Sequence, residues 1–476
     1  MTSRKKCKKS FSKVRMFLGV KVVSNFLALV LFFVLNSWAQ NDNALMRIRE
    51  LDKIQSINGQ LPTLSVSEHS YRAEVYASNR LFKEARLHWQ KILDNYPDDE
   101  TVMPKTLFGI ARSFMWEKDY EKAISYFDIL IKNYPHTREG REGLAFKGAC
   151  LVRMSSHNEA AAVYEQYIRM FPTGERLESS HLNLIDALRE AKRYDEAERW
   201  IELTINKFVN TPTAVNAIHA KLRMMLYREK WEKAVETADT LLRLGNFDGS
   251  MTSRDEVIYL KALALEKLGK QTEALRNYEI ILNPATYYGS LAEEKLKKQV
   301  AKTSVSRISR NFKTTDFPAP FKNEILRHAR SRKIDTRFLL ALMKQESSFR
   351  PQAKSPAGAR GLLQLVYDTA LKYSSEAGYP NLQLDELYKI DVNIAIACVY
   401  IAELIKKFDG FYEAVAAGYN GGEDNAERWL RRTNPKDKGV FVAEIGFAET
   451  KNYVLKVISN YQIYRYLYDE NLNLKQ

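Results

Sequence analysis

The chain has 476 residues, of which 45% are hydrophobic and 28% charged, a balance typical of a globular protein with two to four domains. Of its 73 basic residues eight lie in the first 39 positions, where no acidic residue occurs, so the remainder carries 65 basic against 58 acidic residues. This small and distributed excess lacks the basic runs of a nucleic-acid-binding protein, and we expect no nucleic-acid partner.

Residues 1–39 have the pattern of a secretory signal peptide. A basic stretch precedes Phe26–Leu35, an apolar run of ten residues, and Ser37-Trp38-Ala39 places small residues at a cleavage site before Gln40. The apolar run is too short for a comfortable membrane span. We therefore expect an exported mature chain, with an uncleaved N-terminal anchor as the alternative.

A repeat begins near Ser70 and indicates a helical superhelix over residues 40–285. Each period has a mostly aromatic position three residues before a fixed alanine and an apolar position four residues after it. Each period fits two amphipathic helices, and such pairs bury their apolar faces only by stacking on their neighbours. The pattern resembles tetratricopeptide repeats, and it leaves open whether the superhelix binds partners or only positions the C-terminal part of the chain. The alanines, spaced 38, 37, 37, 37 and 40 residues apart, are Ala85, Ala123, Ala160, Ala197, Ala234 and Ala274.

A charged helix and a polar linker are expected over residues 286–318. The linker is rich in Ser and Thr and is closed by Pro318 and Pro320, which marks a domain boundary. Residues 319–476 then form a second domain with helical periodicity. The predicted fold class is therefore all-α, a tetratricopeptide-like superhelix followed by an α-helical domain.

Seven helices are expected in the second domain, and Asp391 is expected to cap the fourth of them. A small β element is compatible with residues 360–366. Cys150 and Cys398 lie in apolar patterns of different domains, and we expect both to be buried free thiols. The expected helices are 321–332, 336–347, 367–376, 392–408, 411–418, 423–431 and 448–468.

The helix at 336–347 carries a carboxyl group at a position where a core residue is expected. Asp335 can cap this helix, and its apolar face recurs at i, i+3 and i+4 from Leu339, so that the next position of the face is Glu346. Burial raises the pKa of a carboxyl group and keeps it protonated. A protonated Glu beside a loop of small residues is what general acid catalysis requires, whereas the alternative is an exposed Glu at a frayed helix end.

Other chemistries are excluded by the residues that this region lacks. The last of the seven histidines is His328, so the loops that come after it have no histidine to activate a nucleophilic Ser or Cys. No metal-binding spacing and no glycine-rich phosphate loop occurs, and we expect neither metal nor cofactor. Standard glycosidases use two carboxylates. The second is not obvious, and the candidates are Asp368, Glu376, Asp424, Glu444 and Glu449.

Four motifs within residues 321–468 resemble, in the same order, those of soluble lytic murein transglycosylases, whose catalytic domain has a goose-lysozyme-like fold. The family's E-S-x-F, G-x-M-Q-L, A-Y-N-x-G and E-T-x-x-Y-V motifs resemble Glu346-Ser347-Ser348-Phe349, Gly361-Leu362-Leu363-Gln364-Leu365, Gly418-Tyr419-Asn420-Gly421-Gly422 and Glu449-Thr450-Lys451-Asn452-Tyr453-Val454. A helical superhelix before the catalytic domain, and a Tyr-Tyr-Gly stretch at 287–289, also resemble the large soluble members.

The resemblance implies cleavage of the β-1,4 bond between N-acetylmuramic acid and N-acetylglucosamine in peptidoglycan, with a 1,6-anhydromuramyl product. By this analogy Glu346 first protonates the glycosidic oxygen and then takes the proton of the C6 hydroxyl, which closes onto C1. A second protein carboxylate is then unnecessary. The resemblance also implies a periplasmic location and peptidoglycan strands as partners, with cell-wall synthesis or divisome proteins as candidate partners of the repeats.

Further site residues carry over from the resemblance as substrate-binding or supporting groups. Ser355 and Gln364 match residues that hydrogen-bond the sugar, and Gly361 matches a position where the backbone approaches the ligand. Tyr419 matches the tyrosine that faces the acid, and Asn420 supports its turn. The last two matching positions are an active-site carboxylate and a tyrosine one turn later, Glu449 and Tyr453.

The sequence departs from the family pattern at several positions, of which two concern the sugar site. Val366-Tyr367 stand where the family often has Met-Pro, which puts one sugar subsite in doubt. Three alternatives remain open: a hydrolytic muramidase of the same fold, an enzyme acting on chitin, and a non-catalytic cell-wall scaffold. An intact Glu346 speaks against the scaffold.

Overall fold

A computed structural model describes residues 42–281, 283, 285–299 and 312–475, which form helices joined by turns and loops. The predicted signal peptide, Pro284 and residues 300–311 of the predicted linker lie outside the described residues. The chain divides into two compact units. One holds the residues up to Tyr96 together with Lys354–Ala359, and the other holds Pro97–Ala353 and Arg360–Gln476.

The first unit contains a helix at residues 42–55, α2 (Val66–Ser78) and α3 (Phe82–Asn95). Its helices are joined through a buried carboxylate on the first of them. Asp52 accepts a hydrogen bond from Tyr76 Oη at 2.6 Å, and its other oxygen lies 2.5 Å from Arg72 Nη1. The unit is therefore held by polar contacts as well as by apolar packing.

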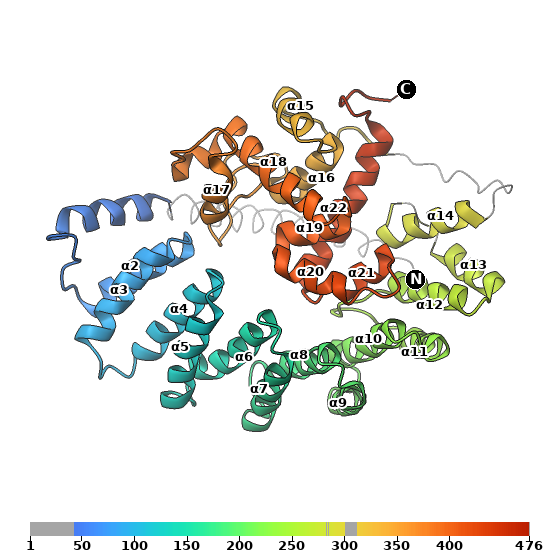
Figure 1. Ribbon diagram of the computed structural model, residues 1–476, viewed down its shortest axis with the longest axis horizontal. Coiled ribbons are helices and arrows are strands. Elements are labelled where there is room, and N and C mark those ends of the chain that lie inside the picture. Colours follow the sequence, from blue (N-terminus) through green and yellow to red (C-terminus); the bar gives the residue numbers. More distant parts are fainter. Residues whose placement is uncertain (1–41, 282, 284, 300–311, 476) are drawn as a thin grey trace, which may run out of the picture. The chain divides into compact units, whose positions relative to one another are not determined.

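The second unit begins with the remaining helices of the repeat region and the charged helix that follows them, and each of these helices packs against the next along the chain (Figure 1). The six alanines of the repeat, one of which lies in α3 of the first unit, are fully buried, and each is the fourth residue of its helix. Repeat register and helix boundaries thus follow the sequence pattern. The helices are α4 (Met103–Trp116), α5 (Tyr120–Asn133), α6 (Arg138–Arg153), α7 (His157–Met170), α8 (Leu177–Glu190), α9 (Tyr194–Lys207), α10 (Pro212–Tyr227), α11 (Trp231–Leu244), α12 (Arg254–Lys267), α13 (Gln271–Ile280) and α14 (Tyr287–Gln299).

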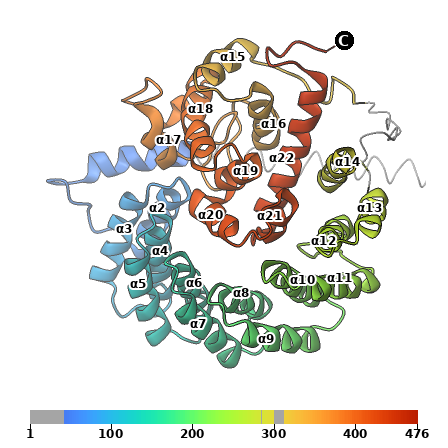
Figure 2. The ribbon, with the colours of Figure 1, turned by 45° about the vertical axis from the view of Figure 1, so that its right-hand side comes forward.

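The same unit continues into the helices of the predicted second domain, where α16 lies beside α22 (Figure 2). All seven expected helices are present, and the all-α prediction is confirmed for the described residues. An isolated antiparallel bridge joins Arg360 and Leu365, within the segment that is compatible with a small β element. The elements are α15 (Lys322–Ser331), α16 (Thr336–Ser347), α17 (Tyr367–Ser374), the 3₁₀ helix η1 (Leu384–Tyr388), α18 (Ile390–Lys407), α19 (Tyr412–Gly421), α20 (Glu423–Arg431), α21 (Lys438–Glu444) and α22 (Ala448–Leu467).

The expectation that Asp391 caps α18 is wrong. Lys389 occupies the N-cap, and Asp391 lies in the first turn, where its carboxylate is hydrogen-bonded to His328 Nε2 at 2.8 Å. His328 of α15 therefore binds the carboxylate that the sequence pattern had assigned to the N-cap of α18. The sequence analysis also missed η1 and α21, which with five and seven residues are too short to show a repeated amphipathic pattern.

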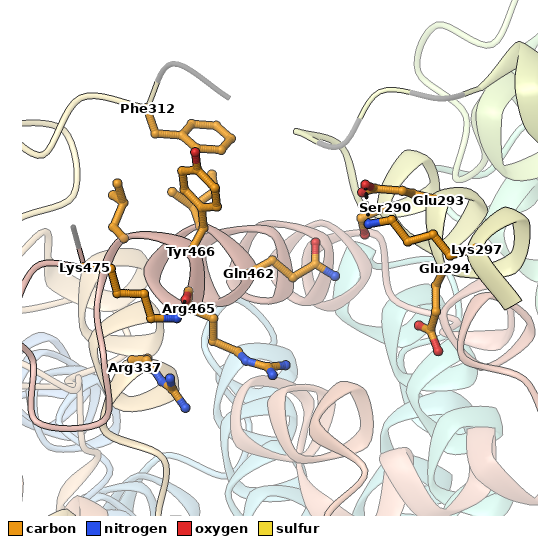
Figure 3. Close-up of a pocket in the computed structure, with 12 residues that line it drawn as sticks. Ser290, Glu293, Glu294, Lys297, Phe312, Arg337, Gln462, Arg465, Tyr466 and Lys475 are labelled. Carbon is orange, nitrogen blue, oxygen red and sulfur yellow. Dashed lines mark hydrogen bonds and ion pairs between the residues drawn. The ribbon is translucent and has the colours of Figure 1, made fainter. Parts of the chain in front are cut away.

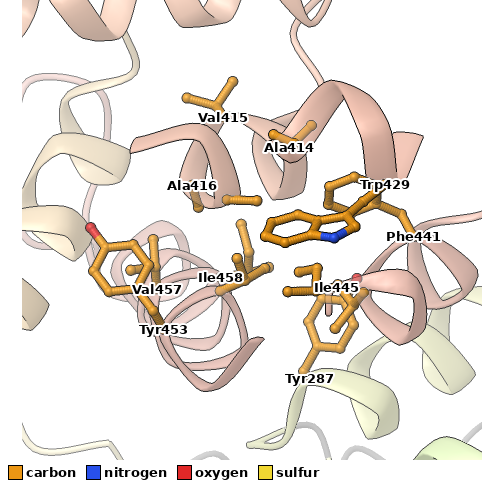
Figure 4. Packing of buried hydrophobic residues seen from close by; sticks show 14 of the residues in the cluster. Tyr287, Ala414, Val415, Ala416, Trp429, Phe441, Ile445, Tyr453, Val457 and Ile458 are labelled. Carbon is orange, nitrogen blue, oxygen red and sulfur yellow. The ribbon is translucent and has the colours of Figure 1, made fainter. Parts of the chain in front are cut away.

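Within the second unit α14, which follows the repeats, packs directly on α21. Tyr287 and Tyr288 of α14 donate hydrogen bonds to the carbonyl oxygens of Lys438 at 3.1 Å and of Gly439 at 3.3 Å. Figure 4 shows Tyr287 in the same apolar cluster as Trp429. The repeat helices and the C-terminal helices of this unit therefore share one core.

Both cysteines of the described residues, Cys150 and Cys398, are buried and unbridged, as expected. None of the helices in the described ranges combines the length and the apolar character that a bilayer crossing requires. The predicted domain boundaries at residues 285 and 318 stay predictions.

Candidate active site

The last turn of α16 presents Glu346. The helix begins as the sequence predicts, because the Asp335 carboxylate accepts a hydrogen bond from the Arg337 N–H at 2.9 Å. The apolar face that begins at Leu339 is fully buried, and Glu346 on that face is partly buried rather than exposed. Ser348 and Phe349 then adopt positive φ of 50° and 64°, so the chain turns sharply away from the helix directly after Glu346.

Tyr453 of α22 is the hydrogen-bonding partner of this carboxyl group. Its hydroxyl donates to Glu346 Oε1 at 2.5 Å across 107 residues of sequence. The ring of Tyr453 is buried beside Val457 at the border of the apolar cluster (Figure 4). The hydroxyl is therefore held at a fixed position by packing, and it can stabilise a negative charge on Glu346.

The surroundings raise the pKa of Glu346 to about 7. Burial is the main cause, because it disfavours the charged form. The hydrogen bond from Tyr453 acts in the opposite direction, and the negative charge of Glu449 adds to the rise. At neutral pH the group is therefore divided between its acid and its carboxylate forms, which suits a residue that gives and takes a proton.

Tyr419 and Gln364 shape the loop that faces this region. The Tyr419 hydroxyl donates to the carbonyl oxygen of Leu363 at 2.6 Å, and its ring lies 5.4 Å from that of Tyr400. The side-chain amide of Gln364 donates to the carbonyl oxygens of Ala353 at 3.0 Å and Gly361 at 2.8 Å. Both predicted site residues thus fix the backbone of the loop from different directions.

Gly361 is required by the backbone of this loop, and Asn393 of α18 is a residue that binds the loop and that the sequence analysis missed. Gly361 has a φ of 81°, and a Cβ there would lie 2.2 Å from the carbonyl oxygen of Leu387. The fully buried Asn393 side chain accepts from the Leu363 N–H at 2.8 Å and donates to the Arg360 carbonyl oxygen at 3.0 Å. A polar residue inside the apolar pattern of α18 was the signal that could have identified it.

Asn420 and Glu449 lie where α19 and the first turn of α22 meet. Asn420 Oδ1 accepts a hydrogen bond from Thr450 Oγ1 at 2.7 Å, which ties the two motifs together. Glu449 is exposed, in the first turn of α22, where a carboxylate is favourable against the helix dipole. Its influence on Glu346 is electrostatic.

Ser355 belongs to the other compact unit. There its hydroxyl oxygen accepts a hydrogen bond from the Ala359 N–H at 3.1 Å, which closes a tight turn. Its role in binding a sugar stays a prediction.

Most of the other candidate carboxylates have cationic partners. Glu444 is fully buried and contacts Arg189 at 2.7 Å, Arg223 at 3.0 Å and Arg432 at 3.1 Å. Asp424 pairs with Lys118 at 2.7 Å, and Glu376 lies 3.8 Å from Arg332 at an exposed position. Among the candidates, Glu449 is the one whose charge acts on Glu346.

A cavity of about 770 Å³ opens between α14 and α22 (Figure 3). Its walls include Glu293 of α14 and Gln462 and Arg465 of α22. None of the eight predicted site residues lines it. We therefore centre the candidate site on Glu346, where the geometry and the pKa agree.

Comparisons with known proteins agree with this location. A family model described as "Transglycosylase SLT domain" matches residues 324–442, and two tetratricopeptide repeat models match residues 105–137 and 151–208. The first match includes Glu346 and Tyr419 but ends before Tyr453. The assignment of Glu449 and Tyr453 to the site therefore depends on their motif and on the contact with Glu346.

The curated relatives are bacterial. The soluble lytic murein transglycosylase of Escherichia coli K12 is 32% identical over 32% of this chain and 24% of its own length. A relative from Haemophilus influenzae is 26% identical over 59% of this chain and 48% of its own length. The membrane-bound lytic murein transglycosylase C of Salmonella arizonae is 30% identical over 28% of this chain and 42% of its own length. The chain thus spans about half the length of these relatives or less.

The chain is similar to the crystal structure of the 70 kDa soluble lytic transglycosylase from Escherichia coli, with 16% identity and a TM-score of 0.48. The aligned region covers 92% of this chain and 80% of that protein's chain. The family models and the curated relatives confirm the predicted resemblance: the chain combines tetratricopeptide repeats with a region similar to the transglycosylase SLT domain of soluble lytic murein transglycosylases.

Proposed function

We propose that the protein is a lytic transglycosylase that cleaves the β-1,4 bond between N-acetylmuramic acid and N-acetylglucosamine in peptidoglycan. Glu346 serves as the single acid and base. The observation that carries the proposal is a partly buried carboxyl group with a pKa of about 7 that is bound to a tyrosine hydroxyl. The similarity of the surrounding residues 324–442 to the transglycosylase SLT domain supports the proposal.

The reaction has two proton transfers at one carboxyl group. Protonated Glu346 gives its proton to the glycosidic oxygen as the bond from C1 to that oxygen breaks. The Glu346 carboxylate then takes the proton of the C6 hydroxyl while that oxygen bonds to C1, so the product is a 1,6-anhydro ring and no water is consumed. The Tyr453 hydroxyl stabilises the carboxylate between the two transfers.

The substrate lies against the loop and helix ends around Glu346. Tyr419 and Gln364 keep the loop backbone in place, and Asn420 keeps α19 against the start of α22. Gly361 and Glu449 contribute further predicted contacts to the sugar. Tyr367, at a position that departs from the family pattern, donates to the Leu382 carbonyl oxygen at 3.0 Å and alters one subsite wall.

The experiment is digestion of purified sacculi followed by mass spectrometry of the released muropeptides. Transglycosylation gives anhydromuramyl ends that are one water lighter than reducing ends. Reducing ends would instead identify the protein as a hydrolytic muramidase, in which Glu346 would also be the acid. Digestion of chitin in parallel tests the other polymer, and unchanged sacculus digestion by Glu346→Gln would favour the scaffold.

The cellular setting belongs to the same proposal. We place the protein in the periplasm, where the polymer lies, and we assign the repeats to partner binding by cell-wall synthesis or divisome proteins. Cell fractionation tests the location. Affinity capture of cell-wall synthesis and divisome proteins by the full chain, in which the repeat helices are intact, tests the partners.

A further inference from the structure

A cluster of charged side chains lies within the second unit where α8 and α10 meet α20 and α21. Four arginines gather there with three carboxylates, and the distances show which charges are matched. Glu444 contacts three of the arginines, and Asp186 lies 2.8 Å from Arg189. The members are Arg189, Arg223, Arg428 and Arg432 with Asp186, Glu190 and Glu444.

Arg428 is the cation that this cluster leaves without a close partner. Its Nε lies 3.6 Å from Glu190 Oε1, which is beyond a good hydrogen bond, and that oxygen already accepts from Arg432 Nη1 at 2.8 Å. Arg428 Nε has no hydrogen-bonding partner among the described residues. Burial lowers the pKa of Arg428, as expected for a cation that is poorly compensated.

A cavity of about 220 Å³ opens beside these groups. A water molecule takes about 30 Å³ of liquid, so the space accommodates a small ion with part of its hydration shell. Among the residues that line this cavity, Glu190 is the one carboxylate, whereas the cationic or basic residues are more numerous. The lining cationic or basic residues are His157, Arg189, Lys192, Arg428, Arg431 and Arg432.

Further nitrogens in the walls of the cavity lack hydrogen-bonding partners within the described part of the chain. Nε of Arg189 and Nδ1 of His157 are both buried without a hydrogen-bonding partner there. The Arg189 side chain is only 4% exposed. Buried N–H groups are rarely left unsatisfied, and guanidinium groups match the planar or tetrahedral oxygens of oxyanions.

We propose that this cavity is a binding site for a small oxyanion, a carboxylate or a phosphate group, held by Arg428 with Arg189 and His157. The anion supplies the negative charge that the cluster lacks. Because the cavity is lined from α7, α8, α20 and the turn after α20, the anion strengthens the contact between the repeat helices and the C-terminal helices of this unit. The proposal does not depend on the reaction at Glu346.

Thermal melting of the full chain at low ionic strength and pH 7 tests the proposal. Sodium phosphate and sodium acetate are titrated separately, with sodium chloride at matched ionic strength as the reference. We expect a saturable rise in Tm of a few degrees with one of the two oxyanions. The stronger response distinguishes phosphate from carboxylate, and no response beyond that of chloride to either would overturn the proposal.

The variant Arg428→Gln removes the unmatched charge, and its expected Tm differs between buffer without oxyanion and buffer with oxyanion. Without oxyanion its Tm is equal to or higher than that of the natural chain, whereas its response to the oxyanion is lost. Arg169→Gln is the matched control, because Arg169 lies on α7 at an exposed position and pairs with Glu165. A lower Tm of Arg428→Gln in oxyanion-free buffer, or a retained response, would contradict the proposal.

Direct binding keeps the proposal testable if Arg428→Gln does not fold. Equilibrium dialysis of the natural chain with radiolabelled phosphate or acetate, whichever gives the larger rise in Tm, should give one site per chain. His157→Gln, at a partly exposed position, should weaken binding of that oxyanion severalfold without loss of Tm in oxyanion-free buffer. Unchanged binding by this variant would show that the cavity is not the site.

Discussion

Two carboxyl groups of the C-terminal helices, Glu346 and Glu444, are placed in opposite surroundings. Both lose water on folding, which alone raises a carboxyl pKa. Three arginines contact Glu444 and lower its pKa to about 2, whereas Glu346 has a tyrosine hydroxyl and a like charge nearby and its pKa is raised to about 7. Burial disfavours the charged form at both sites, and the neighbouring charges decide whether the group serves stability or proton transfer.

The comparison gives each carboxyl group a distinct pH signature. Glu444, with a lowered folded pKa, contributes stability that is present above its unfolded pKa near 4.5 and is lost as the pH falls through 2. Glu346, with a raised folded pKa, contributes stability that is present below pH 4.5 and is lost as the pH rises through 7.

The largest expected effect is the loss of activity in Glu346→Gln. The amide cannot donate or accept the transferred proton, so the rate of sacculus digestion should fall by about 10²–10⁴-fold. Glu413→Gln is the matched control, because burial also raises the pKa of Glu413 and Tyr287 also hydrogen-bonds it, at 3.4 Å. Equal losses in both variants would show that the effect reflects burial alone.

The next effect is on stability and concerns Glu444→Gln. Removing the charge leaves three buried arginines without their shared partner, which should cost about 3–5 kcal/mol of the free energy of unfolding. Urea unfolding followed by circular dichroism measures it. Glu427→Gln, which breaks a more exposed pair with Lys407, should cost less than about 1 kcal/mol. A similar cost in both variants would show that the buried arginine contacts of Glu444 contribute no more than an exposed ion pair.

A smaller effect of opposite sign is expected for the stability of Glu346→Gln. At pH 8 the natural chain carries a desolvated carboxylate that the amide removes, so the variant should be more stable on the order of 2 kcal/mol. At pH 4 the natural group is protonated and the difference should vanish. Unfolding measured at both pH values tests this, and a gain that persists at pH 4 would refute the raised pKa.

Tyr453→Phe should reduce activity about tenfold and shift its pH profile. The hydroxyl stabilises the carboxylate, so its removal raises the pKa of Glu346 further and moves the alkaline limb of the activity profile to higher pH. Tyr461 lies on the same helix as Tyr453, and its hydroxyl binds Asp335 instead of Glu346. Tyr461→Phe should therefore leave the alkaline limb in place. A limb that stays fixed in Tyr453→Phe would exclude the contact.

The smallest effect on the pH profile is expected for Glu449→Gln, because Glu449 is exposed and acts on Glu346 through its charge alone. Removing a negative neighbour lowers the pKa of Glu346, so the alkaline limb should move to lower pH, the reverse of the tyrosine variant. High salt should screen the effect in the natural chain. Glu470→Gln, three residues beyond the C-terminal end of α22, is the control, and an equal shift in this variant would indicate a general charge effect.

Local pattern was enough to place much of the fold. The alanines of the repeat are fully buried, and α16 begins after the Asp335 cap and ends at Ser347, as the sequence predicts. Helix spacing, caps and repeat period depend on contacts within a few residues, which a single sequence displays directly. The identity of Glu346 as an acid candidate also followed from its position on an apolar face.

The tertiary structure decided the partners of these groups. The Tyr453 hydroxyl reaches Glu346 across 107 residues, and Arg189 reaches Glu444 across 255. Asp391 was misassigned because a histidine from another helix takes its carboxylate, and Asn393 was missed because its bonds go to a loop about 30 residues earlier. Periodicity says which face of a helix is buried but not which helix covers it. The sequence by itself therefore determined the helices and the candidate acid, whereas only the packing determined the pKa that makes Glu346 suited to its proposed role.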